Sequence, residues 1–314
     1  MDLTPANLAA MFTNFSLLYQ EGYTSTPPWW RQLATLVPSK SETTTYGWMD
    51  KIPKLRKWIG ARQVQNVSAR SQIVPNVTFE LTESVPKEKI QDDQYGLYSP
   101  LASQMGQQAS KWPDQTLISD VFSANPTAFD GVAFFNASHP VNIDQGATGP
   151  LGTYSNLSAS GMALTAPNYG TVRATMRAYK GADGQPLNVT PNLLVVPPAL
   201  EESARIILTA EFIPAFIQGN STAGNAGTQQ NVWKGSADLL VIPELAGNDT
   251  TWYLADTTNV IKPFVFQLRE APQFAYLNRP TDPNVFWNKE FIFGVEARGA
   301  ATTALPFLMY KASS

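Results

Sequence analysis

Apolar residues recur at helical spacing near the start of the chain. Thr4 is placed to cap a helix, Pro5 occupies its first position, and Gly22 ends it. Between them the apolar residues fall on one face, at Leu8, Met11, Phe12, Phe15, Leu18 and Tyr19. The pattern predicts a helix from Pro5 to Gly22 whose apolar stripe docks on its own chain or on a neighbouring one.

A longer helical pattern begins near residue 99. Ser99 is predicted as its cap and Pro100 as its first residue, and one face carries Leu101, Met105, Ala109 and Trp112. Pro113 is expected to kink or restart the helix, because proline has no N–H to donate to the preceding turn. The apolar stripe continues to Phe122, which gives a run of about 25 residues, roughly 37 Å long if fully helical.

Between these two helices lies a strand pattern. Apolar residues of one parity alternate with polar ones, at Val77, Phe79, Leu81 and Val85. Pro75 and Asn76 are predicted to reverse the chain, with residues 64–74 as the outgoing strand, so that residues 61–92 form a long hairpin. An isolated two-stranded hairpin is marginal in water. This one is therefore expected to lie on an external surface.

From residue 160 onward, helical and strand patterns alternate. A helix closing at Gly181 carries Tyr169, Val172, Met176 and Tyr179 on one face. A buried strand at 193–196 precedes a helix that opens at Pro197 and Pro198. Later strands are predicted at 237–242, 252–254, 264–268, 274–277, 291–297 and 305–310. No repeat of solenoid or propeller length occurs, and the fold class is predicted to be α+β.

Composition favours association between subunits. Apolar residues make up 43% of the 314 residues, but charged residues make up only 15%, against about 25% in an ordinary soluble domain. Interface cores are depleted in charge and enriched in aromatic residues. A large monomeric core explains the same figures, so the composition favours association only modestly. The net charge of −3 and the single basic stretch at 51–62 predict only weak, non-specific contact with DNA.

The sequence carries no recognisable set of catalytic residues. The absence of cysteine excludes disulfides, thiolate metal sites and cysteine nucleophiles. His139 is the only histidine, in a turn-like context, and no G-x-S-x-G motif accompanies it. Asp92 and Asp93 are interpreted as a solvated turn, because adjacent carboxylates point apart in extended chain. No catalytic, cofactor-binding or metal site is predicted.

The first residues do not resemble a targeting signal. Residues 1–5 lack a basic stretch followed by an apolar one, and no apolar run reaches membrane-spanning length. The chain is therefore expected to be soluble, intracellular where it is made, and not bound to a membrane. Eight N-x-Ser/Thr sequences occur, as chance predicts for a chain rich in these residues.

Several separated motifs resemble one protein family. They lie at 46–48, 53–56, 58–60, 92–98, 135–140, 192–198, 252–256 and 288–298. In these segments the chain resembles the Mu-like prophage major head subunit family. The order of arm, hairpin, long helix, α/β region and returning strands resembles the tailed-phage capsid fold of the Hong Kong ninety-seven type. The resemblance extends from residue 8 to residue 310.

The resemblance implies a division of the chain. It implies an N-terminal arm (1–60), an E-loop hairpin (61–92), a peripheral domain with the spine helix (93–159), an axial domain (160–260) and returning peripheral-domain strands (261–314). The hairpin would then lie on a neighbouring subunit. The suspected intersubunit contacts are Val77, Phe79, Leu81 and Val85.

The function implied is that of a major capsid protein. Copies would assemble into pentamers and hexamers of an icosahedral head enclosing phage DNA, in the virion and, during assembly, in the bacterial host cytoplasm. Implied partners are the chain itself, a separate scaffolding protein, a portal and, where present, a decoration protein. The arm motifs begin about 45 residues after Met1, so no removable segment is expected. An encapsulin-type shell protein and, more distantly, a secreted β-rich binding protein are the alternatives.

Overall fold

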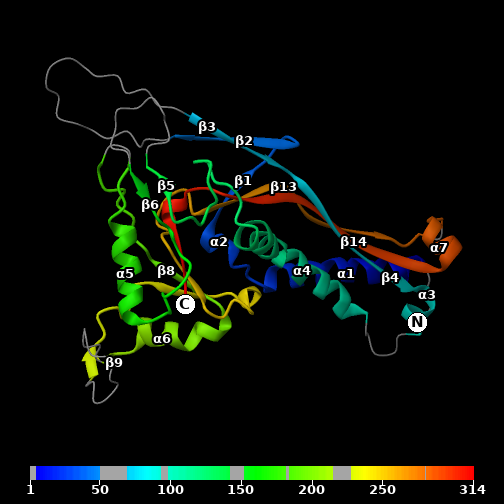
Figure 1. Cartoon of the computed structure of the whole chain (residues 1–314). Helices are drawn as coiled ribbons and strands as arrows, with labels where there is room; N and C mark the ends of the chain where they lie inside the picture. Colours follow the sequence, from blue (N-terminus) through cyan, green and yellow to red (C-terminus); the bar gives the residue numbers. More distant parts are fainter. Residues whose placement is uncertain are drawn as a thin grey trace.

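Two β-sheets organise the chain (Figure 1). The computed structural model describes residues 5–49, 69–92, 98–141, 152–181, 184–214, 228–279 and 281–314. The four-stranded sheet has the order β1 (Ala34–Pro38), β13 (Phe264–Leu277), β14 (Glu290–Thr303) and β4 (Val77–Pro86). The five-stranded sheet has the order β11 (Asp238–Val241), β8 (Leu193–Val196), β12 (Thr251–Ala255), β15 (Met309–Ser313) and β7 (Leu157–Ser158).

The long strands β13 and β14 form the centre of the four-stranded sheet. β13 is a single strand of 14 residues, where the sequence predicts two strands with a break between them. Its pairing with β14 shifts register twice, between Leu268 and Glu270 and between Glu270 and Gln273. Bulges of this kind absorb extra residues without ending a strand. The polar stretch that separates the two predicted strands is therefore a pair of irregularities inside one.

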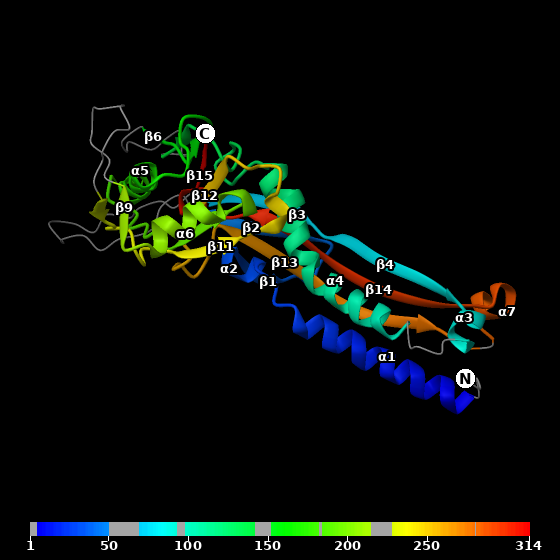
Figure 2. The same ribbon diagram turned by 90° about the horizontal axis from the view of Figure 1, so that it is seen from below.

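Two helices cover one face of this sheet, α1 (Pro5–Ser25) and α4 (Ser99–Leu117), and Figure 2 shows them side by side along it. In α1, Phe12, Phe15 and Tyr19 are buried and contact aromatic rings of β13 and β14. The predicted apolar stripe thus docks on its own chain.

The two helices approach so closely that glycine is required where they cross. A Cβ atom on Gly106 would lie 2.1 Å from the carbonyl oxygen of Tyr19, and one on Gly22 would lie 2.1 Å from that of Ser103. Helix α1 continues past Gly22 to Ser25, so the prediction that Gly22 ends the helix is wrong. This glycine instead provides space for the neighbouring backbone.

Helix α4 continues through its internal proline. Pro113 lies within the helix, which passes directly into a π-helical segment at Ile118–Ser123. The helix begins at Ser99, with Tyr98 as its N-cap, so the predicted cap is one residue too late in the chain. The predicted continuous apolar run is confirmed, because Leu117, Val121 and Phe122 are all buried in one core.

The five-stranded sheet has helices on one face and the rest of the molecule on the other. Helices α5 (Ala166–Arg177) and α6 (Glu201–Thr209) pack on the face that carries Leu194 and Leu254. Leu193 and Tyr253 point to the opposite face and share a core with Phe264 and Phe266 of the long sheet. The two sheets are therefore joined by a common apolar core.

Helices α5 and α6 and strand β8 appear where the sequence predicts them. Thr165 caps α5 by accepting a hydrogen bond from the Asn168 N–H at 3.4 Å. The last strand differs from expectation, because β15 pairs with β12 in the five-stranded sheet. Of the described strands after residue 260, β13 and β14 lie in the four-stranded sheet and β15 lies in the five-stranded sheet, and the domain division stays a prediction.

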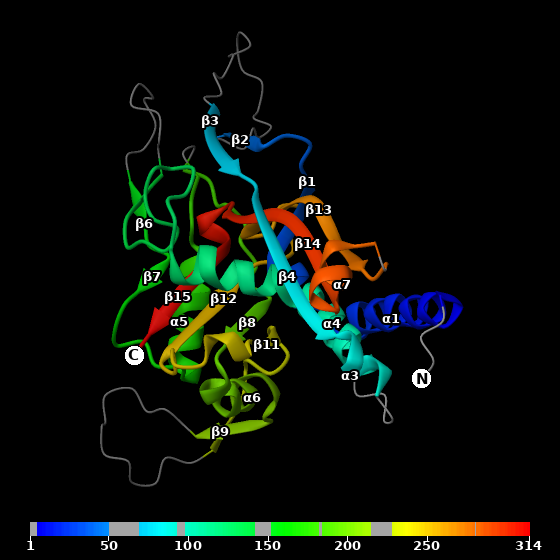
Figure 3. The same cartoon turned by 90° about the vertical axis from the view of Figure 1, so that its right-hand side faces the viewer.

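The predicted hairpin over residues 61–92 is wrong. Strand β3 (Ala69–Pro75) pairs with β2 (Thr43–Met49), whereas β4 pairs with β14. Figure 3 shows β3 leading directly into β4, so Pro75 and Asn76 join two consecutive strands that have different partners. An alternating pattern tells which face of a strand is buried but not which strand pairs with it. Part of the predicted hairpin, residues 61–68, lies outside the described residues.

Short elements complete the described chain. They are α2 (Trp30–Leu33), α3 (Lys87–Gln91), β5 (His139–Pro140), β6 (Thr153–Tyr154), β9 (Phe212–Pro214), β10 (Thr228–Gln230), α7 (Pro283–Asn288) and 3-10 turns at Pro198–Leu200, Pro243–Leu245 and Pro306–Leu308. None of the described helices has both the length and the apolar character needed to cross a membrane.

Candidate assembly surfaces

Strands β2 and β3 form a two-stranded ribbon that stands apart from the long sheet (Figures 1 and 3). In the ribbon, Tyr46 lies opposite Gln72 and Thr44 lies opposite Val74. This face turns toward the sheet: Val74 is buried, and the Tyr46 hydroxyl donates to Gln267 Oε1 at 2.8 Å. Burial raises the pKa of Tyr46 to about 12. The other face carries Ile73, which is 66% exposed, so the ribbon offers an apolar side chain to a partner.

The four suspected contact residues all lie on β4, in the subunit's own sheet. Val85 is buried in the core beneath α1 and α4, and Leu81 packs against the same core. Phe79 packs against Trp112, with ring centroids 5.3 Å apart. Val77 is 49% exposed. That these residues contact a neighbouring subunit stays a prediction, although Val85 has little surface left to offer.

An apolar cavity of about 370 Å³ lies beside two of these residues. It opens between β4, β14 and α4, and its walls include Phe79, Leu81, Ala109, Trp112, Pro272 and Val295. The Nε1–H of Trp112 is buried and has no hydrogen-bond partner within the described chain. The described lining residues are mainly apolar and include one titratable side chain, Glu80, so they contain no acid–base pair.

An exposed aromatic pair that the sequence patterns did not predict lies at the tip of the long sheet. Phe286 and Trp287 lie in α7, at the end of the β13–β14 hairpin that is remote from the five-stranded sheet (Figures 1 and 2). They are 67% and 77% exposed and contact each other edge to face, with centroids 5.0 Å apart. The feature of the sequence that could have indicated this site is the pair of adjacent aromatic residues in a short segment between two predicted strands. Such side chains are typical of interface anchors.

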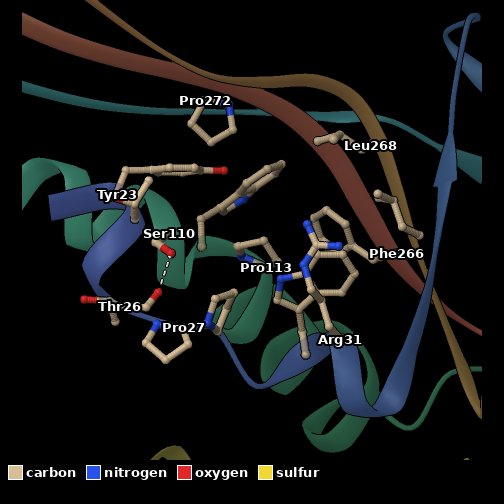
Figure 4. Close-up of a pocket in the computed structure, with 14 residues that line it drawn as sticks. Tyr23, Thr26, Pro27, Arg31, Ser110, Pro113, Phe266, Leu268 and Pro272 are labelled. Carbon is tan, nitrogen blue, oxygen red and sulfur yellow. Dashed lines mark hydrogen bonds between the residues drawn. The ribbon is translucent and has the colours of Figure 1, made fainter. Parts of the chain in front are cut away.

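A second cavity, of about 220 Å³, lies where the end of α1 meets α4 and β13 (Figure 4). The Ser110 hydroxyl donates to the Thr26 carbonyl at 2.8 Å across one side of it. Arg31 contributes the one charged side chain among its described lining residues, and this guanidinium lies over the Trp30 ring at 4.7 Å. The lining thus contains neither a nucleophile–base pair nor a set of metal ligands.

Asp114 ties the chain after α1 to helix α4. Its carboxylate accepts hydrogen bonds from the backbone N–H groups of Trp30, at 2.8 Å, and Trp29, at 3.4 Å. Burial raises the pKa of Asp114 to about 6, although these two hydrogen bonds act in the opposite direction. The contact fixes the start of α2, and with it the point where the chain enters β1.

His139 is fully buried and serves as a structural connection. Its Nδ1 lies 2.5 Å from Asp130 Oδ2, and its Nε2 lies 3.1 Å from both the Phe134 carbonyl and Asn156 Oδ1. The Asn156 Nδ2 donates to the Phe134 and Pro306 carbonyls, which leaves its Oδ1 as an acceptor. Both ring nitrogens therefore lie within hydrogen-bond distance of oxygen atoms of the surrounding loops.

This network contains no nucleophile that His139 could activate. The residue belongs to β5, not to the predicted turn, and through Asn156 its network reaches the 3-10 turn at Pro306–Leu308, which precedes β15. Within the described ranges, no group of three or more His, Cys, Asp and Glu side chains is placed to hold a metal ion. The surfaces that remain for a function are the exposed ribbon, the apolar cavity and the aromatic tip.

Comparison with known proteins gives a match along nearly the entire chain. The family model described as Mu-like prophage major head subunit gpT matches residues 8–163, 157–245 and 244–314. The chain is 25% identical over 304 residues to the major capsid protein of Escherichia phage Mu, covering 96% of this chain and 72% of that protein.

Two further similarities agree with this match. The chain is 22% identical over 298 residues to the Mu-like prophage FluMu major head subunit of Haemophilus influenzae, covering 95% of this chain and 70% of that protein. Its structure is also similar to a subunit of the procapsid of bacteriophage JBD30, with a TM-score of 0.61 and 25% identity. That alignment covers 99% of this chain and 76% of the JBD30 chain.

Proposed function

The chain belongs to the family of Mu-like prophage major head subunits, and from this premise we propose that its copies join as pentamers and hexamers around packaged DNA. Members of the family are structural proteins of the phage capsid, so the chain is a major capsid protein and not an enzyme. The predicted family and the predicted α+β capsid fold are confirmed. The observation that carries the proposal is the family match from residue 8 to residue 314.

The exposed apolar side chains support self-association. Ile73 on the ribbon and Phe286 and Trp287 at the tip are each more than half exposed. Fully burying a large apolar side chain is worth roughly 1.5–3 kcal/mol. A standard stable interface buries about 1,600 Å² in total, and a shell subunit with several neighbours needs several such areas. Because charged residues make up only 15% of the chain, burying these surfaces requires little free energy for the desolvation of charged groups.

The other partners follow from the same proposal. A separate scaffolding protein, a portal and, where present, a decoration protein contact the shell, which assembles in the bacterial host cytoplasm. Contact with packaged DNA is weak and non-specific, because the net charge is −3 and Lys and Arg are scattered apart from the 51–62 stretch. That basic stretch lies outside the described residues.

Expression with the scaffolding protein of its own phage, followed by sedimentation and electron microscopy, tests the proposal. We expect closed particles with icosahedral symmetry, and nuclease-protected DNA in heads taken from phage lysates. A strictly monomeric species under these conditions would contradict self-assembly. Closed shells that contain a bound enzyme and no DNA would instead assign the chain to an encapsulin-type compartment.

A further inference from the structure

The direction of the β2–β3 ribbon is not fixed by main-chain pairing to the sheet. Among the described strands, β2 and β3 pair only with each other. The ribbon connects β1 to β4, which are the two opposite edges of the four-stranded sheet. It therefore passes over the central strands β13 and β14 without extending either of them. Side-chain contacts beneath the ribbon must set the angle at which it leaves the subunit.

One buried amide makes three of these contacts. Gln267 lies in the central strand β13 and is 0% exposed. Its Oε1 accepts from the Tyr46 hydroxyl at 2.8 Å, and its Nε2 donates to Asn76 Oδ1 at 2.6 Å and to the Val74 carbonyl at 3.4 Å. All three side-chain contacts go to the ribbon or to its junction with β4. A buried amide is costly unless it is hydrogen-bonded, so this position is stable only with the ribbon seated.

Further hydrogen bonds restrict the orientation of the ribbon on the sheet. Asn76 Nδ2 donates to Ser39 Oγ at 2.9 Å and to the Ser41 carbonyl at 2.8 Å. These bonds join the end of β3 to the segment that leads into β2. On the other strand, Gln72 Nε2 donates to Thr302 Oγ1 at 2.9 Å. An apolar seat would tolerate rotation, because dispersion has no preferred direction, whereas hydrogen bonds weaken steeply when they are bent.

We propose that Gln267 is a positioning residue for assembly: it sets the direction of the β2–β3 ribbon and through it the geometry with which neighbouring copies join. The inference rests on the proposed capsid function. The seven residues of β2 span about 20 Å at roughly 3.3 Å per residue. A rotation of about 10° at the base therefore moves the far end of the paired region by roughly 4 Å. Such a displacement is enough to misplace side-chain contacts with a neighbour.

The test replaces Gln267 in the full chain and measures both folding and shell geometry. Gln267→Met keeps the length of the side chain but removes its donor and acceptor. Gln267→Glu restores the contacts only when protonated, because a neutral carboxyl donates to Asn76 Oδ1 and accepts from Tyr46, whereas a carboxylate faces two acceptors, Asn76 Oδ1 and the Val74 carbonyl. Asn76 cannot simply rotate its amide, since its Nδ2 is engaged with Ser39 and Ser41.

We expect Gln267→Met to fold cooperatively but to give at least about tenfold fewer closed particles of wild-type diameter, with open or irregular assemblies instead. Gln267→Glu should show the same defect at pH 8 and recover to within about twofold of wild type at pH 5, when both are compared at the same pH. Hydrogen exchange of the isolated subunit should speed up in β2 and β3 and remain unchanged in β8 and β12.

A matched control separates positioning from loss of stability. Asn231 is also a buried amide, and its Nδ2 donates to the Ile207 and Ala210 carbonyls beside α6, away from the ribbon. Asn231→Leu should lower the melting temperature but leave the shells that form with the wild-type diameter. Normal shells from both Gln267 variants at pH 8 would overturn the inference, as would the same misassembly from Asn231→Leu. Failure of the wild-type chain to assemble would instead refute the proposed function.

Discussion

The crossing of α1 and α4 gives a prediction in which two physical effects have opposite signs. In an exposed helix, replacing glycine by alanine stabilises by about 1 kcal/mol, because glycine loses more backbone freedom on folding. At Gly106 the added methyl would lie 2.1 Å from the Tyr19 carbonyl oxygen and 2.8 Å from the Tyr23 N. Both atoms belong to the backbone of α1, so no side chain can rotate away.

The magnitude follows from the displacement that the methyl group imposes. Normal contact requires about 3.4 Å, so α1 must move outward by more than 1 Å along this direction. That shift loosens Phe12, Phe15 and Tyr19, which are buried against the sheet. Overpacking of a well-packed core costs about 1–3 kcal/mol, and a rigid backbone obstacle places Gly106→Ala at the upper end. We expect a net loss of about 2–3 kcal/mol in the free energy of unfolding.

Urea denaturation of the isolated subunit, followed by tryptophan fluorescence, measures this loss. The matched control is Gly294→Ala in β14, where the nearest atom to an added Cβ is the Thr82 hydroxyl at 3.9 Å. The control should change the free energy of unfolding by less than about 0.5 kcal/mol. If Gly106→Ala is neutral or stabilising, α1 does not lie against α4 in solution and the described packing of these two helices is wrong.

Three further predictions concern stability and assembly. Protonated Asp114 stabilises the fold fully below its ordinary pKa of 3.8, and this stabilisation is lost as the pH rises through about 6. Between pH 4 and 7 the free energy of unfolding of the wild type should therefore fall by about 2 kcal/mol more than that of Asp114→Asn. Equal pH profiles of the two proteins in thermal melts would refute this. Trp287→Ser should leave the melting temperature of the subunit unchanged yet reduce the yield of closed shells, and normal yields by sedimentation would exclude the tip from the interfaces. Combined Phe79→Ser and Leu81→Ser should lower the free energy of unfolding of the isolated subunit by about 2–4 kcal/mol, because both half-buried side chains pack on its own core. An unchanged melting temperature would show that the two side chains act only between subunits.

Local patterns predicted the elements well where one short segment contains all the information. The helix around Tyr169 and Met176 and the buried strand at 193–196 are where periodicity places them, because each face of these elements is set by side chains a few residues apart. The apolar stripe of α4 was also predicted through Pro113. Resemblance to the family supplied the function, which no single residue of this chain could have indicated.

Long-range pairing was beyond the reach of such patterns. The alternation from Val77 to Val85 fits any partner strand, and the true partner, β14, lies more than 200 residues later. The role of Gln267 was equally hidden, because a glutamine within an apolar strand shows its partners only when the ribbon folds over it. His139 was expected in a turn for the same reason: Asp130, Phe134 and Asn156 surround it only in the folded chain.

A density map of the assembled head, resolved to side chains, would show directly how copies of this chain join. We expect pentamers and hexamers in a closed icosahedral shell. We also expect the β2–β3 ribbon of each copy to rest on Gln267 of its own sheet and to present its exposed face to a neighbouring subunit. A shell built without this chain, or one in which ribbon and aromatic tip both face solvent, would contradict these expectations.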